Sequence, residues 1–143
     1  MTFFDDVEFW NGRRVPFYKR AQLTVADLAL AFDYQGWGGL HDLGELTIFA
    51  DNLVPHVLRT DGVLLYDTDL ARIDREELIP AGSKEEIEIR ACALHSVELI
   101  VHEIRQMRQV IKPMDIDFLL WNRGQGFLYK SNKPRHRTRT VFY

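Results

Sequence analysis

The sequence has 143 residues, of which 46% are hydrophobic and 27% charged, and a formal net charge of −3. This length and composition predict one domain, residues 1–143, and exclude a disordered chain. The negative balance argues against a general nucleic-acid or anionic-membrane binder, so we expect no direct nucleic-acid partner and no membrane. The single cysteine, Cys92, excludes an intrachain disulfide and indicates a cytoplasmic location. Its apolar helical surroundings predict that Cys92 is a core residue.

The first third of the chain predicts helices separated by a glycine-rich loop. Residues 17–32 place apolar side chains on one face at helical spacing, and Pro16 before them favours a helix start. The glycines of residues 35–39 end this helix. The apolar segment 46–58 contains Pro55, which disfavours helical geometry just before it, so we expect two short helices with a break near Asn52.

The clearest element begins at Ser83, which with Glu86 forms the sequence pattern of a capping box. A long apolar stripe follows and predicts a helix to about Gln109, with a shorter helix before it at 68–78. Pro113 interrupts the chain, and a last helix is expected over 114–122. The apolar end of the basic tail is expected to dock on the domain. Alternating strand patterns are not evident, so the predicted fold class is all-α.

Metal and cofactor sites are poorly supported by the sequence. The five histidines form no tight ligand pair, and His95 and His102 lie two helical turns apart, too far to share an ion directly. The glycines at 36–39 follow a predicted helix, whereas a phosphate-binding glycine loop precedes one. The sequence therefore predicts no metal site and no phosphate-binding glycine loop.

Three aspartates stand inside apolar runs, where a carboxylate is costly unless it is paired or hydrogen-bonded. Asp117 lies in the run 114–121, Asp51 in the run 46–55, and Asp27 in a Val-Ala-Asp-Leu segment. Such groups often mark functional sites. Each also has a structural interpretation: Asp27 bonds a neighbouring group, Asp51 or Asn52 caps a helix, and Asp117 pairs with a buried arginine such as Arg90.

Paired carboxylates are suited to the cleavage of an N-glycosidic bond. One carboxylate stabilises or captures the oxocarbenium-like transition state while another polar group assists the departing base. An aromatic side chain beside them can stack on a flat base. Phe49, two residues before Asp51, is such a candidate, although it is equally consistent with a core residue.

At these residues the sequence resembles the queuosine salvage proteins. Blocks that match this family in order cover nearly the whole chain: Phe17–Gln22 with Val25–Asp27, Thr47–Asp51 with Val54 and Pro55, Glu86–Ala91, Val97–Ile100, Asp117–Trp121, and His136–Arg139 with Phe142 and Tyr143.

The resemblance implies the activity of a queuosine 5′-phosphate N-glycosylase, which hydrolyses the nucleotide and releases the base queuine. It implies a fold like that of the helical DNA glycosylases and no cofactor. The family's catalytic aspartate falls on Asp117, and its base-recognition motif on Phe49–Asp51, with Asn52 beside it also assigned to the substrate. Lys19 is the first candidate for binding the 5′-phosphate, and Arg20, Arg137 and Arg139 are the alternatives.

Members of this family are usually more than twice as long, so the chain is expected to correspond to their C-terminal part. It is interpreted as a fragment, a mis-started reading frame or a natural short form. Two alternatives to a glycosylase stay open. One is a module that binds queuine or its nucleotide without cleaving it. The other is a helical subunit that needs a separate N-terminal chain.

Overall fold

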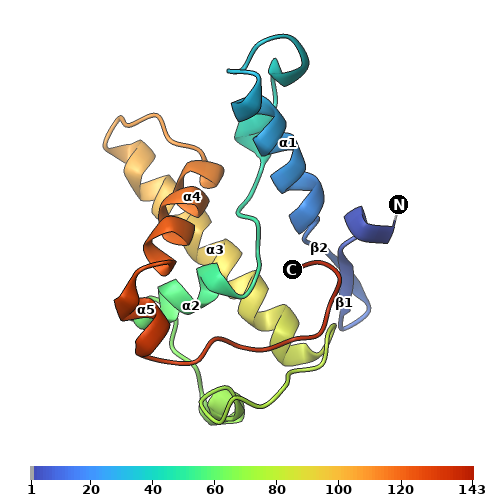
Figure 1. Cartoon of the computed structure of the whole chain (residues 1–143), viewed down its shortest axis with the longest axis vertical. Helices are drawn as coiled ribbons and strands as arrows, with labels where there is room; N and C mark the ends of the chain where they lie inside the picture. The colour runs from blue at the N-terminus through green and yellow to red at the C-terminus, as the bar shows by residue number, and fades with distance from the viewer. Residues whose placement is uncertain (1) are drawn as a thin grey trace.

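The computed structural model describes residues 2–143, with Asp69 described by its backbone alone. The fold is mostly helical with one small sheet, so the expectation of an all-α fold is corrected (Figure 1). The helices and strands are β1 (Val7–Trp10), β2 (Arg13–Pro16), α1 (Lys19–Ala31), α2 (Leu53–Thr60), α3 (Lys84–Gln106), α4 (Pro113–Gly124) and α5 (Phe127–Ser131). Short 3₁₀ turns lie at Thr2–Phe4, Gly36–Gly38, Leu43–Glu45 and Thr68–Arg72.

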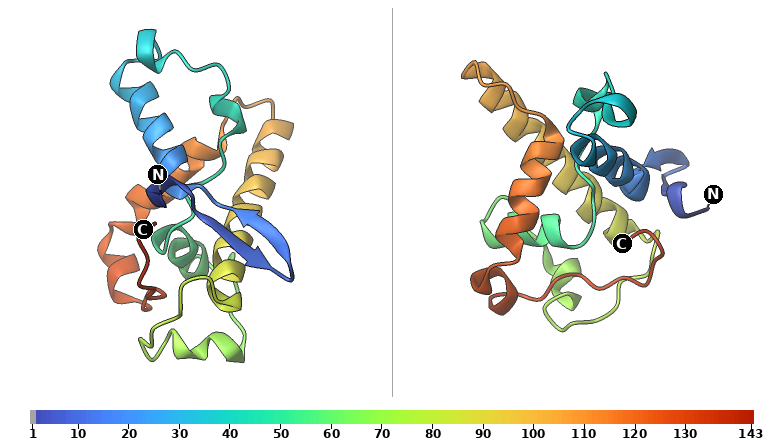
Figure 2. Two further views of the ribbon diagram at one scale, coloured as in Figure 1. Left: turned by 90° about the vertical axis from the view of Figure 1, so that its right-hand side faces the viewer. Right: turned by 45° about the horizontal axis from the view of Figure 1, so that its top comes forward.

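The sheet is an antiparallel hairpin that projects from the helices (Figure 2, left). Val7 pairs with Pro16 and Trp10 with Arg13, so two residues form the turn. These are Asn11 and Gly12, both with positive φ (47° and 76°). Asn-Gly is the sequence that favours this tight hairpin turn, because both positions need left-handed backbone.

The helix expected over 17–32 is present as α1, but its buried face differs from the expected apolar stripe. Ala26 and Ala29 are completely buried, whereas Leu28 and Phe32 are exposed. The small alanines allow a close approach of the turn at Gly38, where an added Cβ would lie 2.8 Å from the Leu28 carbonyl oxygen.

The helix expected before Asn52 is absent, because residues 46–50 are extended. This segment runs between α1 and α4 (Figure 1; Figure 2, right). Its backbone groups are satisfied by distant side chains instead of a helical ladder. The Phe49 N–H donates to Asp117 Oδ1 at 2.8 Å, and the Ala50 carbonyl oxygen accepts from Arg90 Nε at 3.0 Å.

The long helix after Ser83 is confirmed as α3. Ser83 Oγ accepts from the Glu86 N–H at 3.3 Å, which forms half of the expected capping box. The Glu86 carboxylate turns inward to Arg90 and makes no bond back to Ser83. Cys92 on this helix is exposed, so its assignment to the core is wrong.

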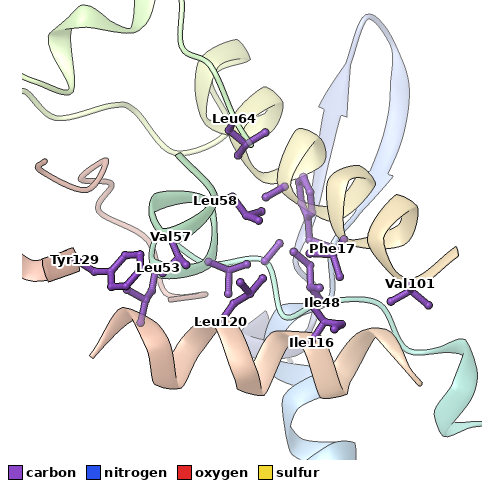
Figure 3. Packing of buried hydrophobic residues seen from close by; sticks show 14 of the residues in the cluster. Phe17, Ile48, Leu53, Val57, Leu58, Leu64, Val101, Ile116, Leu120 and Tyr129 are labelled. Carbon is purple, nitrogen blue, oxygen red and sulfur yellow. The ribbon is translucent and has the colours of Figure 1, made fainter. Parts of the chain in front are cut away.

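The main core lies where α2 and α4 meet α3 (Figure 3). Ile48 from the extended segment packs there beside Ile116 of α4 and Phe17. α2 and α4 come close at Gly124, where an added Cβ would lie 2.6 Å from Leu53 Cδ1. Burial of both faces of the extended segment fixes its position relative to α4.

The tail docks on the domain as expected. The Arg137 carbonyl oxygen accepts from the Ile79 N–H at 2.8 Å, and His136 is buried. Tyr143 donates its hydroxyl to Glu86 Oε1 at 2.8 Å. Within residues 2–143, no helix is both long and apolar enough to cross a bilayer.

Candidate functional site

A cavity of about 440 Å³ lies between α1, the extended segment and α4. Most of the sequence-predicted site residues line it, although they come from three separate parts of the chain. Its walls are Lys19, Leu23 and Asp27 from α1, Phe49 from the extended segment with Asp51 directly after it, and Asp117, Phe118, Trp121 and Asn122 from α4. The volume and the mixture of apolar walls with a few polar groups are typical of a small-molecule site.

Asp117 is a buried carboxylate in this cavity, with 3% of its surface exposed. Burial raises its pKa to about 7, and the negative charge of Asp51 adds to this rise. The hydrogen bond from the Phe49 N–H and the positive charge of Lys19 act in the opposite direction and lower the pKa. The expected pairing of Asp117 with Arg90 is wrong, because the donor to Asp117 is the Phe49 amide.

Asp51 has a structural role as well as a place in the cavity. Its Oδ1 accepts from the N–H groups of Leu53 and Val54 at 2.7 and 3.1 Å, so it caps the start of α2. Both bonds use one oxygen, and Oδ2 accepts no hydrogen bond from the described residues. This second oxygen is available to a ligand.

Phe49 is a core residue that also lines the cavity. Its ring is 3% exposed and belongs to a second core cluster with Ala26 and Met114. The ring meets Phe118 edge-on, with centroids 5.8 Å apart. Phe49 and Phe118 therefore form a rigid apolar wall of the cavity.

Lys19 is the cation among the described residues that line the cavity. It is the first residue of α1, and its backbone N–H donates to Asp6 Oδ2 at 3.2 Å. Within the described residues its ammonium group makes no ion pair. The alternatives for phosphate binding lie elsewhere: Arg20 donates to the Phe142 carbonyl oxygen, and Arg137 lies beside Glu76.

A buried ionic centre supports the site from behind. Arg90, 1% exposed, donates to Asp6 and Glu86, and its guanidinium lies 3.9 Å from the centroid of the Phe17 ring. Arg90 Nε also donates to the carbonyl oxygen of Ala50, the residue between the cavity residues Phe49 and Asp51. Arg90 thus acts on the site from outside the cavity.

Two sequence-based assignments look different in the structure. Asn52 does not line the cavity, and its side chain makes no capping hydrogen bond, so its role in substrate binding stays a prediction. Asp27, expected to bond a neighbouring group, makes no hydrogen bond or ion pair within the described residues and faces the cavity.

Sequence reasoning also missed some residues. Asp6 lies in an acidic, aromatic N-terminal segment, and nothing in its neighbourhood signals that it is completely buried. Leu23 could have been found, because it lies one helical turn from both Lys19 and Asp27.

The family model for the queuosine salvage proteins matches residues 1–143. The chain belongs to the queuosine salvage protein family. Among curated members, the queuosine 5′-phosphate N-glycosylase/hydrolase of Sphaerobacter thermophilus is 47% identical over 141 residues, and that of Dictyostelium discoideum is 39% identical over 141. The protein of the same name from Mus musculus is 33% identical over 148 residues.

These alignments cover 97–98% of this chain but only 43–44% of the relatives. The chain therefore spans less than half the length of the curated queuosine salvage proteins it matches. The relatives carry their additional length within the same chain, so the comparisons give no support to a separate N-terminal chain.

Proposed function

We propose that this chain carries the catalytic cavity of a queuosine 5′-phosphate N-glycosylase and hydrolyses that nucleotide to queuine and ribose 5-phosphate. The observation that carries the proposal is the juxtaposition in one cavity of a buried carboxylate, a second carboxylate and a lysine. Within the part of the chain that the structure describes, one oxygen of the second carboxylate accepts no hydrogen bond and the lysine makes no ion pair. The relatives' names support the same reaction, since they are named for it.

In the proposed mechanism Asp117 faces C1′ of the ribose. As the C1′–N bond breaks, its electron pair leaves with the base, and the positive charge that develops on the sugar is stabilised by the carboxylate. Water then adds to C1′, either directly or after Asp117 has formed a covalent glycosyl intermediate. The Phe49 N–H, donated to Oδ1, fixes the orientation of the carboxylate during this step. The apolar wall of Trp121 excludes water and strengthens the field of the carboxylate.

Asp51 is proposed to recognise the base by hydrogen bonding, and Phe49 is proposed to pack against the base. Queuine retains the pyrimidine edge of guanine, with a ring N–H and an exocyclic amine that both donate. The Oδ2 of Asp51 is free to accept from this edge in a charge-assisted hydrogen bond, while Oδ1 holds the start of α2.

Lys19 is the proposed ligand of the 5′-phosphate. Its ammonium is near enough to the proposed catalytic carboxylate to lower the pKa of Asp117, which supports a phosphate ligand close to the sugar that Asp117 would face. If Lys19 has this role, Lys19→Ala removes the preference for the nucleotide over the unphosphorylated nucleoside.

The proposal extends to fold and location. We propose that the helical part follows the architecture of the helical DNA glycosylases, as the resemblance of its sequence blocks to this family implies. A cytoplasmic location is proposed because the substrate is a phosphorylated nucleotide, which does not cross membranes freely, and because the single Cys92 indicates a reducing compartment.

The test is incubation of the purified chain with queuosine 5′-phosphate, followed by chromatography for free queuine. Asp117→Asn keeps the volume and an acceptor for the Phe49 N–H but removes the charge. It should lower turnover by at least about a hundredfold, the scale of losing a preorganised electrostatic contact. Near-normal turnover in this variant would move the catalytic role to another residue, with Asp51 next.

The second candidate is a module that binds queuine without cleaving it. It is favoured by one observation, the coverage of less than half of the relatives' length. If calorimetry shows that the chain binds queuine, but incubation with the nucleotide releases no queuine, the chain is such a binding module.

A further inference from the structure

We propose that Asp27 is a specificity residue that recognises the positively charged amine in the side chain of the queuine base. The inference rests on the proposed function, because it concerns the ligand of the same cavity. It assigns the cavity to a zwitterionic ligand, with an anionic group at Lys19 and a cationic group at Asp27.

The position of Asp27 is the first argument. It lies on α1 eight residues after Lys19, so the two side chains start about 12 Å apart along the helix axis. Leu23 lies between them and lines the same cavity. The side of the cavity formed by α1 thus carries a cation at one end, an apolar side chain in the middle and an anion at the other end.

The unused charge of Asp27 is the second argument. Asp51 caps α2 and Asp117 accepts from a backbone amide, so both of these carboxylates have structural partners. Asp27 lines the cavity without a hydrogen bond or ion pair within the described residues. An aspartate in that position has its charge available for a ligand.

The charge balance of the cavity is the third argument. Among the described residues, three carboxylates and one lysine line it. A ligand that carried only a phosphate would meet more negative than positive charge, which disfavours its binding. A second, cationic group on the ligand removes this conflict.

The chemistry of queuine supplies such a group. The base is a 7-deazaguanine whose 7-aminomethyl substituent carries a cyclopentenediol, and its secondary amine is protonated at neutral pH. The amine is carried by the base and the phosphate by the sugar, so the two charges are separate groups of one nucleotide. Asp27 can therefore meet the amine while Lys19 meets the phosphate, and guanine-type nucleotides without the substituent lose the contact.

Binding measurements test the inference without requiring turnover. Calorimetry compares queuine with 7-deazaguanine, which lacks the 7-substituent, on the unmutated chain and on three variants. Asp27→Asn removes the charge at constant shape, and Asp27→Glu retains it. Asp33→Asn is the matched control, because Asp33 is exposed, lies six residues further on and does not line the cavity.

We expect the unmutated chain to prefer queuine, and Asp27→Asn to reduce this preference about fivefold, the scale of a partly exposed ion pair. Binding of 7-deazaguanine should be unchanged, and Asp27→Glu and Asp33→Asn should retain the preference. Equal weakening of both bases by Asp27→Asn, or no preference in the unmutated chain, overturns the inference. A chain that shows the Asp27-dependent preference but releases no queuine from the nucleotide refutes the hydrolase proposal alone.

Discussion

At the scale of single residues, the ionisation of Asp117 predicts the pH range in which the proposed mechanism can operate. Burial raises its pKa to about 7, so the carboxylate is only partly ionised at neutral pH. An ordinary aspartate would be fully ionised there. The proposed mechanism needs the anion, so the rate of hydrolysis should rise with pH through about 7 and level off above it. A rate that falls over this range contradicts an anionic role for Asp117.

The same raised pKa predicts how stability depends on pH. The folded chain keeps a proton on Asp117 that the unfolded chain releases above its ordinary pKa of 3.8. The contribution of Asp117 to the stability of the fold therefore falls as pH rises from about 4 to about 7, and its full cost is present above that. Asp117→Asn removes this cost.

We expect Asp117→Asn to be more stable than the unmutated chain at pH 8, by on the order of 2 kcal/mol, and nearly equal to it at pH 4. Urea unfolding at the two pH values measures the difference. A variant that is less stable at pH 8 would show that the carboxylate stabilises the fold through contacts beyond the Phe49 amide.

Asp51→Asn separates the two roles of Asp51. Asparagine is a good helix cap, so α2 and the fold should be retained. Its side chain replaces one acceptor with a donor, so queuine binding should weaken by at least about tenfold, on the order of 1.4 kcal/mol. Asp42→Asn, at an exposed position outside the cavity, is the control for calorimetry. Unchanged affinity in Asp51→Asn refutes the base-reading role.

At the scale of elements, the crossing of α2 and α4 holds Asp51 and Asp117 in place relative to each other. Gly124 permits this crossing, because a Cβ there would lie 2.6 Å from Leu53 and 2.9 Å from Val57. Gly124→Ala should destabilise the fold by about 1–3 kcal/mol through overpacking. Gly44→Ala, where an added Cβ meets nothing within 4 Å, is the matched control in thermal unfolding. Equal melting temperatures for the two variants would mean that the helices separate without cost.

The elements also differ in how far the sequence could predict them. α3 was predictable because its signals are local: the cap at Ser83 and an apolar stripe on one face. The segment before α2 was not, because its conformation depends on distant side chains that bind its backbone, among them Asp117 and Arg90. The hairpin has one local signal, the Asn11-Gly12 turn, but its strands of four residues are too short to show a clear alternating pattern.

The candidate site was predictable to a similar extent. Asp117, Asp51, Phe49 and Lys19 were identified largely through the family resemblance, and the fold brings all four to one cavity. Asp27 was expected to have a structural partner, because periodicity does not distinguish a helix face that borders a cavity from one that borders solvent.

At the scale of the whole molecule, Arg90 joins segments that are far apart in the sequence. It binds Asp6 near the N-terminus and Glu86 on its own helix, and Glu86 accepts in turn from Tyr143 in the tail. It also holds the backbone at Ala50. Loss of this side chain therefore affects both ends of the chain and the site together.

Arg90→Met should destabilise the fold by about 3 kcal/mol or more, because it leaves two buried carboxylates without their cation. It should also weaken queuine binding, since the segment between Phe49 and Asp51 loses its anchor. Arg75→Met removes an exposed arginine paired only at the surface and should change little. If denaturant unfolding gives similar free energies of unfolding for both variants, the buried ionic network around Arg90 does not stabilise the packing of these segments.

The hydrogen bond between Phe49 and Asp117 has a consequence for spectroscopy. The Phe49 amide proton points at the carboxylate that we propose carries the chemistry, and this amide is buried. Its chemical shift should move downfield as the acceptor becomes an anion, because charge-assisted hydrogen bonds are stronger and shorter. In a ¹⁵N-labelled sample, this one resonance would trace the titration of Asp117 with a midpoint near pH 7. A bound ligand that places a cation beside the carboxylate would shift the midpoint to lower pH, so the same signal would report on the charge of whatever occupies the cavity.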